Sequence, residues 1–327
     1  MKQKPIVLAV ALLTAAPAAI AAGEMTVYGK IHVAAESQEV NVKVDEEGTA
    51  YVKEDRLAVE SHASRFGVKG FVDISESLQA IYKLEWQVDV TDESKDLNIT
   101  SRNQYGGLKG GFGTLFAGRH DTPLKMSQGK FDLFNDKFGD IKTLMSGELR
   151  SDNVIQYGLP SSLGNFKGWA QWSPTEDESD DSTWSLMGAY KGEYFYGALA
   201  YDSYADDDSL VRLTGIVPIG SFGIGAMYNA GKPDEGDDQN AWGANAYWKI
   251  GNGKIRLQYV DSDGQTVGKA ASVKEGGKQT SIGYSHKLGK KSEVYVDYSS
   301  LDIDSELKND ISVFGLGFVT KFGAKVM

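Results

Sequence analysis

The sequence predicts an all-β protein, a transmembrane antiparallel β-barrel of about sixteen strands. Three observations predict this fold. Apolar and polar residues alternate in segments of eight to thirteen residues along most of the chain. Long and short connections between these segments alternate, as expected for outer loops and periplasmic turns. Beyond the N-terminal segment, no run approaches the ~18 apolar residues of a transmembrane helix, which excludes a helical membrane protein.

The clearest strand signal lies between Ser77 and Asp89. Leu78, Tyr82 and Trp86 fall on one face of this segment, whereas Lys83 and Glu85 fall on the other. The same criterion predicts strands at 25–36, 57–71, 77–89, 99–109, 112–119, 152–159, 164–172, 183–191, 193–202, 209–219, 221–230, 240–250, 253–262, 278–288, 291–302 and 310–322. An even number of strands with both termini on one side is typical of a bacterial outer-membrane barrel.

The connections and the aromatic residues favour a membrane barrel over a soluble β-sandwich or propeller, which also alternates apolar and polar residues. One face of most strands carries charges or amides, which suit a wet lumen and would be costly in a dry core. The predicted long outer loops are 37–56, 90–98, 120–151, 173–182, 203–208, 231–239, 263–277 and 303–309. The aromatic residues expected near the membrane interfaces are Tyr28, Tyr82, Trp86, Trp172, Tyr201, Trp242, Trp248, Tyr259, Tyr298 and Phe322.

The first 21 residues resemble a secretory signal peptide. Lys2 and Lys4 precede an apolar run, and the small residues Ala19 and Ala21 fit a cleavage site. A membrane anchor is the alternative, but the run is too short to span and no stop-transfer pattern follows. We therefore expect a signal peptide at 1–21 and one barrel domain at 22–327.

Composition and motifs argue against several other functions. The chain has no cysteine, so neither disulfides nor thiol chemistry is expected. The net charge of −11 becomes −13 when the two signal-peptide lysines are removed, which argues against nucleic-acid binding. No catalytic or nucleotide-binding motif is present, and the histidines are scattered. His286 and Ser285 are adjacent on one predicted strand and so face opposite ways. We expect no enzyme activity and no cofactor.

Three acidic stretches, SPTEDESDDS, DSYADDD and GKPDEGDDQ, carry much of the negative charge in the predicted outer loops. A solvated rim is the simpler interpretation. Divalent cations that bridge lipopolysaccharide phosphates are the alternative, because carboxylates suit hard cations. The spacing does not match the calcium-binding loop of an EF-hand, so no defined metal site is predicted.

Basic residues recur on the face predicted to line the lumen of the first six strands. Lys30 shares a face with Tyr28 and His32, and Arg102 is expected to point away from Asn103 and Tyr105. By the same alternation, Arg119 is expected on the face opposite Phe116. The full set is Lys30, Arg65, Arg102, Arg119 and Arg150.

The stretches VYGKIHV, SRFGVKG, SRNQYGGLKGGFGTLFAGRHD and RSDNVIQY resemble the general, trimeric, sixteen-stranded porins of Gram-negative outer membranes. The resemblance is strongest over residues 25 to 157. It implies that Lys30, Arg65, Arg102 and Arg150 form the basic side of a pore constriction. It also implies that the third loop, about 120–151, folds into the barrel and brings carboxylates opposite these bases.

The candidate carboxylates in this loop are Asp132, Asp136 and Asp140, whose four-residue spacing favours one side of a short helical turn. The loop lacks the Pro-Glu that better-known members carry before Phe138, so the acid that faces the pore is left open. A disordered outer loop is the alternative.

The last predicted strand resembles the terminal signal that the barrel-assembly machinery recognises. Phe318 and Phe322 lie on one face of that strand, and residues Gly323 to Met327 follow it. Members of this family normally end at the aromatic residue, so the extra five residues depart from the pattern.

These observations predict a water-filled channel for passive diffusion of small hydrophilic solutes and ions. The alternatives are a substrate-specific channel and a structural or adhesive surface barrel. The resemblance implies a homotrimer in contact with outer-membrane lipid and lipopolysaccharide. The acidic rim predicts weak cation selectivity at low salt.

Overall fold

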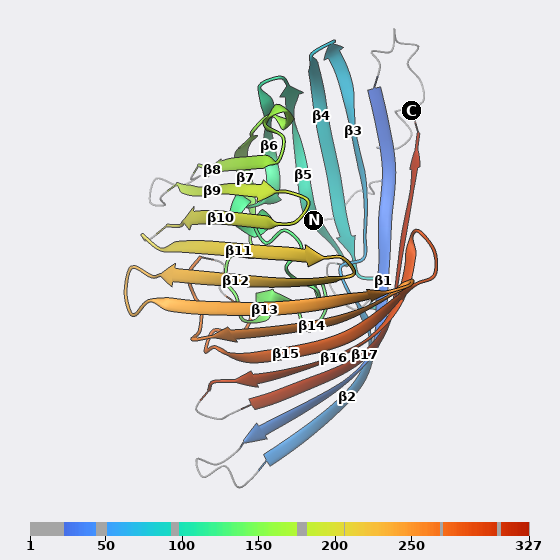
Figure 1. The fold of residues 1–327 in the computed structure, drawn as a ribbon, viewed down its shortest axis with the longest axis vertical. Coiled ribbons are helices and arrows are strands. Elements are labelled where there is room, and N and C mark those ends of the chain that lie inside the picture. Colours follow the sequence, from blue (N-terminus) through green and yellow to red (C-terminus); the bar gives the residue numbers. More distant parts are fainter. Residues whose placement is uncertain are drawn as a thin grey trace, which may run out of the picture.

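The computed structural model describes residues 23–43, 51–92, 98–174, 182–205, 207–268, 271–305 and 309–326. The expected signal peptide lies outside these residues. The strands are β1 (Gly23–Lys43), β2 (Tyr51–Ser61), β3 (Arg65–Ser75), β4 (Leu78–Val88), β5 (Ile99–Gly110), β6 (Gly113–Asp121), β7 (Arg150–Gly158), β8 (Phe166–Ser173), β9 (Thr183–Lys191), β10 (Tyr196–Ser203), β11 (Ser209–Ile219), β12 (Phe222–Lys232), β13 (Gln239–Ile250), β14 (Gly253–Ser262), β15 (Gly277–Lys287), β16 (Ser292–Ile303) and β17 (Asn309–Lys325) (Figure 1). The helices are α1 (Pro123–Met126) and the 3₁₀ turns η3 (Ile141–Thr143) and η4 (Ser161–Leu163). Within the described ranges, no helix has the length and apolar character needed to cross a membrane.

The sheet closes on itself through the first and last strands. β1 pairs antiparallel with β17 along almost its whole length, from Thr26 opposite Lys325 to Val42 opposite Asn309. Its other edge pairs first with β3 and then with β2. From β3 to β17 each strand pairs with its sequence neighbour. This closure leaves the barrel wall without a free edge, apart from the β2 segment described next.

The second strand of the barrel is divided into β2 and β3, so seventeen strand segments form a sixteen-stranded barrel. The prediction of one continuous strand at 57–71 is therefore wrong. The division falls at Ala63, whose φ of 48° lies in the left-handed region that interrupts a strand. The first hairpin is also longer than expected, because β1 continues to Lys43 and β2 begins at Tyr51. In the described part of the chain, β2 pairs with β1 alone.

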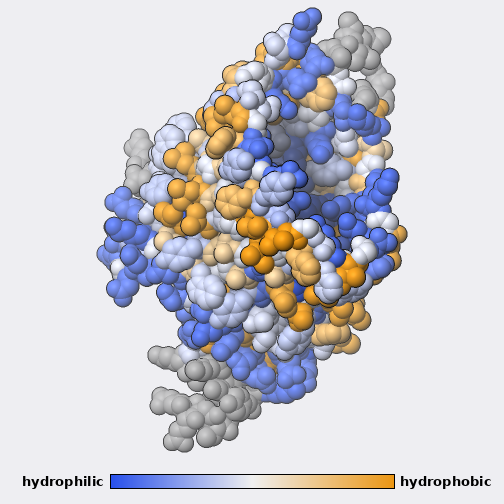
Figure 2. Space-filling model, viewed as in Figure 1, coloured by the Kyte–Doolittle hydropathy of each residue, from blue (hydrophilic) through white to orange (hydrophobic). Residues whose placement is uncertain are grey.

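Large apolar side chains cover the outside of the barrel, as a lipid-facing surface requires. Leu199 and Leu213, for example, are both 57% exposed. Aromatic side chains stack across neighbouring strands, as Phe66 does on Trp86 and Phe222 on Trp248. Figure 2 shows hydrophobic residues over the outer side of the wall and hydrophilic residues around the hollow.

Tyr28 is an exception among the aromatic residues expected at the interfaces. Its hydroxyl donates a hydrogen bond of 2.8 Å to Glu85, on the inner face of β4. The interface assignment of Tyr28 is therefore wrong, whereas its predicted place on the same face as Lys30 agrees with this contact.

The inner face is not uniformly polar, contrary to the simplest interpretation of the alternation. Phe131, Ile141, Leu144 and Met145, from the segment between β6 and β7, are buried inside the barrel. They pack with wall residues that are also buried: Met227, Ala241, Val260 and Leu301. Part of the lumen is thus filled by a small hydrophobic core.

Two adjacent glycines on β5 test how closely β5 packs against β6. A Cβ at Gly107 would lie 2.2 Å from the Leu115 carbonyl oxygen, whereas a Cβ at Gly106 would meet nothing within 4 Å. We expect Gly107→Ala to lower the free energy of unfolding by about 1–3 kcal/mol, because the wall must shift. Gly106→Ala is the matched control and should change it by less than about 0.5 kcal/mol. Denaturant unfolding of refolded protein in lipid vesicles measures both, and equal values for the two variants would contradict the inferred close contact.

Candidate functional site

The loop of residues 122–149 connects β6 to β7 and enters the barrel lumen directly after β6. The Thr122 side chain accepts a hydrogen bond from the Lys125 backbone N–H and caps α1, with Pro123 at the first helical position. The Leu124 backbone N–H donates to the Ser185 hydroxyl on β9 at 3.0 Å, and the Leu124 side chain is fully buried. The cap and this contact fix the start of the loop against the inner wall.

The middle of the loop lies along β13, β14 and β15. Wall side chains bond to its backbone: Gln258 accepts from the Leu133 N–H at 2.8 Å, and Arg256 donates to the Leu133 carbonyl at 3.0 Å. Asn245 donates to the Phe131 carbonyl, and Gln279 donates to the Phe138 carbonyl at 3.0 Å. Polar side chains of the inner wall therefore satisfy loop backbone groups that would otherwise be unpaired inside the barrel.

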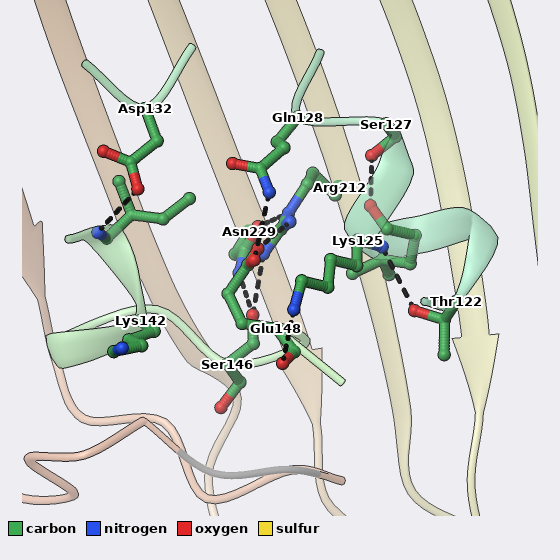
Figure 3. A network of polar contacts seen from close by, with 12 residues as sticks. Thr122, Lys125, Ser127, Gln128, Asp132, Lys142, Ser146, Glu148, Arg212 and Asn229 are labelled. Carbon is green, nitrogen blue, oxygen red and sulfur yellow. Dashed lines mark hydrogen bonds and ion pairs between the residues drawn. The ribbon is translucent and has the colours of Figure 1, made fainter. Parts of the chain in front are cut away.

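The returning part of the loop is held by a buried ion pair (Figure 3). Arg212 on β11 is fully buried; it donates to the Glu148 carboxylate at 2.7 Å and to the Ser146 carbonyl at 2.7 Å. Its third contact is the Asn229 side chain at 2.8 Å. Three hydrogen-bonded partners compensate the desolvation of this guanidinium.

The connection between β14 and β15 contacts this loop through Gln265, Ser272 and Val273. The Ser272 and Val273 N–H groups donate to the Lys142 and Thr143 carbonyls at 3.0 and 2.9 Å. Gln265 accepts from the Ser146 N–H at 2.9 Å. The sequence predicts only an outer loop here, because backbone pairing between two irregular segments has no periodic signal.

Of the three candidate aspartates, Asp136 alone contacts the basic residues. Its carboxylate lies 2.8 Å from the Lys30 ammonium and 3.8 Å from the Arg65 guanidinium. Burial raises the pKa of Asp136, but the charge of Lys30, followed by that of Arg65, outweighs it and lowers the pKa to about 2.

Asp132 and Asp140 hold the loop together instead. Asp140 caps η3 by accepting from the Lys142 N–H and also accepts from the Asp136 N–H at 2.8 Å. Asp132 accepts from the Phe134 N–H at 2.9 Å. The expected helical turn is absent from residues 132–140, and Asp136 has a φ of 64°. The four-residue spacing therefore does not mark one face of a helix. Asp132 and Asp140 cap turns, because a short carboxylate side chain can accept hydrogen bonds from nearby backbone N–H groups.

We call the inner face that carries Lys30, Arg65, Arg102 and Arg150 the basic wall. On this wall, Arg102 donates to Glu85 at 3.1 Å and to Gln87 at 2.8 Å. Arg150 lies 2.9 Å from Asp121 and also bonds to Asn103. Glu85 and Asp121 were not predicted as partners of these arginines. Glu85 was recognisable as inward from its place beside Lys83 on the polar face of 77–89, whereas Asp121 fell in the predicted loop 120–151 and lies in β6 instead.

Two local irregularities change the predicted faces. The pairing of β4 with β5 shifts between Leu84 and Trp86, and Arg102 and Asn103 both contact inner-wall residues instead of alternating. A β-bulge has this effect, since it adds a residue without changing the partner strand. A second shift lies between Gly118 and His120.

Near the second shift, Arg119 pairs with Asp152 and is not among the residues that line the cavity next to Lys30, Arg65 and Arg102. Phe116, expected on the opposite face from the lumen, is 4% exposed and stacks on Tyr105. The assignment of Phe116 to the outer face is therefore wrong.

The basic wall lines a polar cavity of about 460 Å³. Six basic and two acidic side chains line it: Lys30, Arg65, Lys69, Lys83, Arg102, Lys321, Glu85 and Asp121. Lys69, Lys83 and Lys321 were not predicted. Lys30 lies directly opposite both Lys321 on β17 and Arg65 on β3, so three cations form one row across the wall.

The two terminal phenylalanines lie on the outer face of β17. Phe318 is paired with Val33 and Phe322 with Gly29 on β1. A Cβ at Gly29 would lie 2.2 Å from the Phe322 ring, so the glycine makes room for this ring. β17 continues to Lys325, and the prediction that the strand ends at 322 is therefore wrong.

A closed antiparallel barrel with an apolar exterior and a charged lumen defines a membrane channel of the outer-membrane type. The family model described as Gram-negative porin matches residues 8–305. The chain is 25% identical over 354 residues to outer membrane porin protein 32 of Delftia acidovorans, covering 96% of this chain and 92% of that protein.

Solved structures agree on the fold. The anion-selective porin from Comamonas acidovorans has a TM-score of 0.70 at 19% identity, covering 92% of this chain and 100% of that chain. The trimer form of OmpT from Vibrio cholerae has a TM-score of 0.64 at 17% identity, with 92% and 100% covered.

The chain therefore belongs to the Gram-negative porin family. It is an outer-membrane channel for passive diffusion of small hydrophilic solutes, and it is not an enzyme.

Removing the Arg212 side chain should loosen the loop. We expect Arg212→Met to lower the free energy of unfolding by about 3–5 kcal/mol, because the Glu148 carboxylate would be left buried without its cationic partner. Amide hydrogen exchange within residues 141–149 should accelerate by roughly 10²-fold or more. Lys142→Met is the control, since its pair with Asp140 is 3.7 Å long and Lys142 is 54% exposed. Unchanged exchange in Arg212→Met would show that the pair does not anchor the loop.

The pKa of Asp136 predicts how its effect depends on pH. A carboxyl group with a pKa of about 2 stays ionised at pH 4.5. Asp136→Asn, whose side chain also tolerates a positive φ, should shift ion selectivity toward anions equally at pH 7 and pH 4.5. Reversal potentials across a planar bilayer measure this shift. An effect that disappears at pH 4.5 would mean that Asp136 titrates in the ordinary range.

Proposed function

We propose that the pore is narrowest between the basic wall and residues 122–149, and that it favours small anions. The main support for this proposal is that six basic and two acidic side chains line the cavity. Asp136 does not offset this excess fully, because Lys30 and Arg65 share its single carboxylate. Lys30, Arg65, Arg102 and Arg150 form the basic side of this constriction, and Asp136 forms its acidic side.

The net negative charge of the chain favours cations instead. Which ion the pore prefers therefore depends on how far each charge lies from the path of the permeating ion. The potential of an exposed rim decays over a Debye length of ~8 Å at physiological salt. A permeating ion passes within a few Å of the wall, where one unit charge contributes ~4 kcal/mol at an effective dielectric constant of 20. The local wall charges should therefore outweigh the outer loops.

We further propose that the chain is made with a cleaved signal peptide at 1–21 and assembles as a homotrimer in contact with lipopolysaccharide. The trimer form of a structurally similar porin supports the assembly. The outward pair Phe318 and Phe322 supports recognition of the last strand by the barrel-assembly machinery. A gel of unheated protein that contains only monomer, with no trimer after crosslinking, would argue against the homotrimer.

Replacing wall arginines tests the proposed constriction. The wild-type reversal potential in a KCl gradient should show preference for Cl⁻ over K⁺. Arg102→Ala with Arg150→Ala should raise conductance modestly, because the free cross-section grows, and should move selectivity toward K⁺. Lys167→Ala, on the periplasmic end of β8, serves as the control and should leave both unchanged. A wild-type preference for K⁺ would overturn the anion preference, and unchanged values in the double variant would overturn the constriction.

A further inference from the structure

A second, smaller cavity of about 350 Å³ lies between the loop and the inner wall of β14, β15 and β16. Lys254 and Arg256 reach it from β14, close to the two-residue turn between β13 and β14, and therefore near the periplasmic end. Lys130 and Gln128 reach it from the loop. Its remaining polar lining comes from Asp132, Asn135, Ser285 and Glu293. The basic wall described above contributes none of these residues, so this periplasmic pocket is a separate site.

The pocket contains positive charge without a matching negative charge. Lys130 and Lys254 form no ion pair among the residues that the structure describes. The ammonium of Lys254 lies over the Tyr247 ring at 4.5 Å from its centroid. That contact holds the amine without neutralising it.

Arg256 adds a second indication of a missing anion. It is 6% exposed, and its Nε is a buried donor without a hydrogen-bond partner. Its Asp297 partner, at 2.6 Å, is also bound by Lys137 at 2.6 Å. Two buried cations thus share one carboxylate, which leaves about one positive charge uncompensated.

The acidic groups of the pocket do not remove this excess. Burial, and next the neighbouring Asp140 carboxylate, raise the pKa of Asp132 well above its usual range, which reduces its negative charge. Asp132 also accepts from loop N–H groups and from Gln258, so it is directed into the loop. Glu293 remains as the one acid facing Lys130, Lys254 and Arg256.

We propose that the periplasmic pocket binds a small oxyanion with two negative charges, such as phosphate or a dicarboxylate. Lys130 and Lys254 supply its charge recognition, and Gln128, Asn135 and Ser285 supply neutral hydrogen-bonding groups. The volume accommodates a compact anion and a few waters. This site deepens the proposed anion preference by giving the channel a holding site beyond the constriction.

The test is channel current with inorganic phosphate added on both sides of a planar bilayer. In wild-type channels, excess current noise should rise with phosphate concentration and then reach a plateau. Chloride added at equal ionic strength should produce no such noise. Lys130→Gln and Lys254→Gln should each weaken the apparent phosphate affinity at least tenfold. Lys167→Gln, on β8 and outside the pocket, is the matched control and should retain wild-type affinity. Heat-modifiable migration on a gel verifies that each variant is folded.

The outcomes separate the two proposals. Unweakened phosphate affinity in both lysine variants would overturn the pocket, as would an effect lost only in Arg102→Ala with Arg150→Ala, because the anion would then bind at the basic wall. A wild-type preference for K⁺ over Cl⁻ would overturn the proposed anion preference. The periplasmic pocket would then be judged from the phosphate measurements alone. Succinate in place of phosphate distinguishes a dicarboxylate site from a phosphate site.

Discussion

The requirement that every backbone polar group be paired inside a lipid bilayer governs the whole molecule. The β1–β17 pairing meets this requirement for the first and last strands, and it makes the wall continuous. Once the wall is closed, alternate residues must face either lipid or lumen. The apolar exterior and the charged interior follow from this constraint.

The lumen is divided into two unlike parts. On the side of β8 to β16, the loop 122–149 packs its apolar residues against the wall and is anchored through Arg212 and Glu148. On the side of β1 to β5, Lys30, Arg102 and their acidic partners line an open polar cavity. Removing either partner of the buried Arg212–Glu148 pair would leave an unpaired charge inside the barrel.

Most of the barrel could be predicted from the sequence, because a period of two is a direct consequence of strand geometry. Segments such as 253–262 and 183–191 have the predicted bounds. The deviations occur where backbone conformation overrides alternation: the positive φ of Ala63 divides a strand, and the shift near Arg102 turns Asn103 inward. Neither feature has a residue-type signal that distinguishes it from an ordinary strand position.

The candidate site was less predictable because its contacts join segments distant in sequence. Lys30 and Asp136 are 106 residues apart, and only the closed barrel brings them together. The spacing of Asp132, Asp136 and Asp140 suggested equivalent roles, but turn capping accounts for two of them. Lys69 and Lys83 were recognisable as inward by parity, but nothing in their local sequence linked them to Lys30.

The separation of the lumen into a packed side and a wet side has a consequence for how such a channel can change. The residues of the hydrophobic core and the residues of the basic wall belong to different strands. Selectivity can therefore be retuned at the basic side chains of β1 to β5, and cohesion can be improved at Met227 and Ala241 in the hydrophobic core without changing the residues that line the two anion sites. A single chain thus carries two properties that can be adjusted independently, which makes it a suitable starting point for engineering pores of altered selectivity.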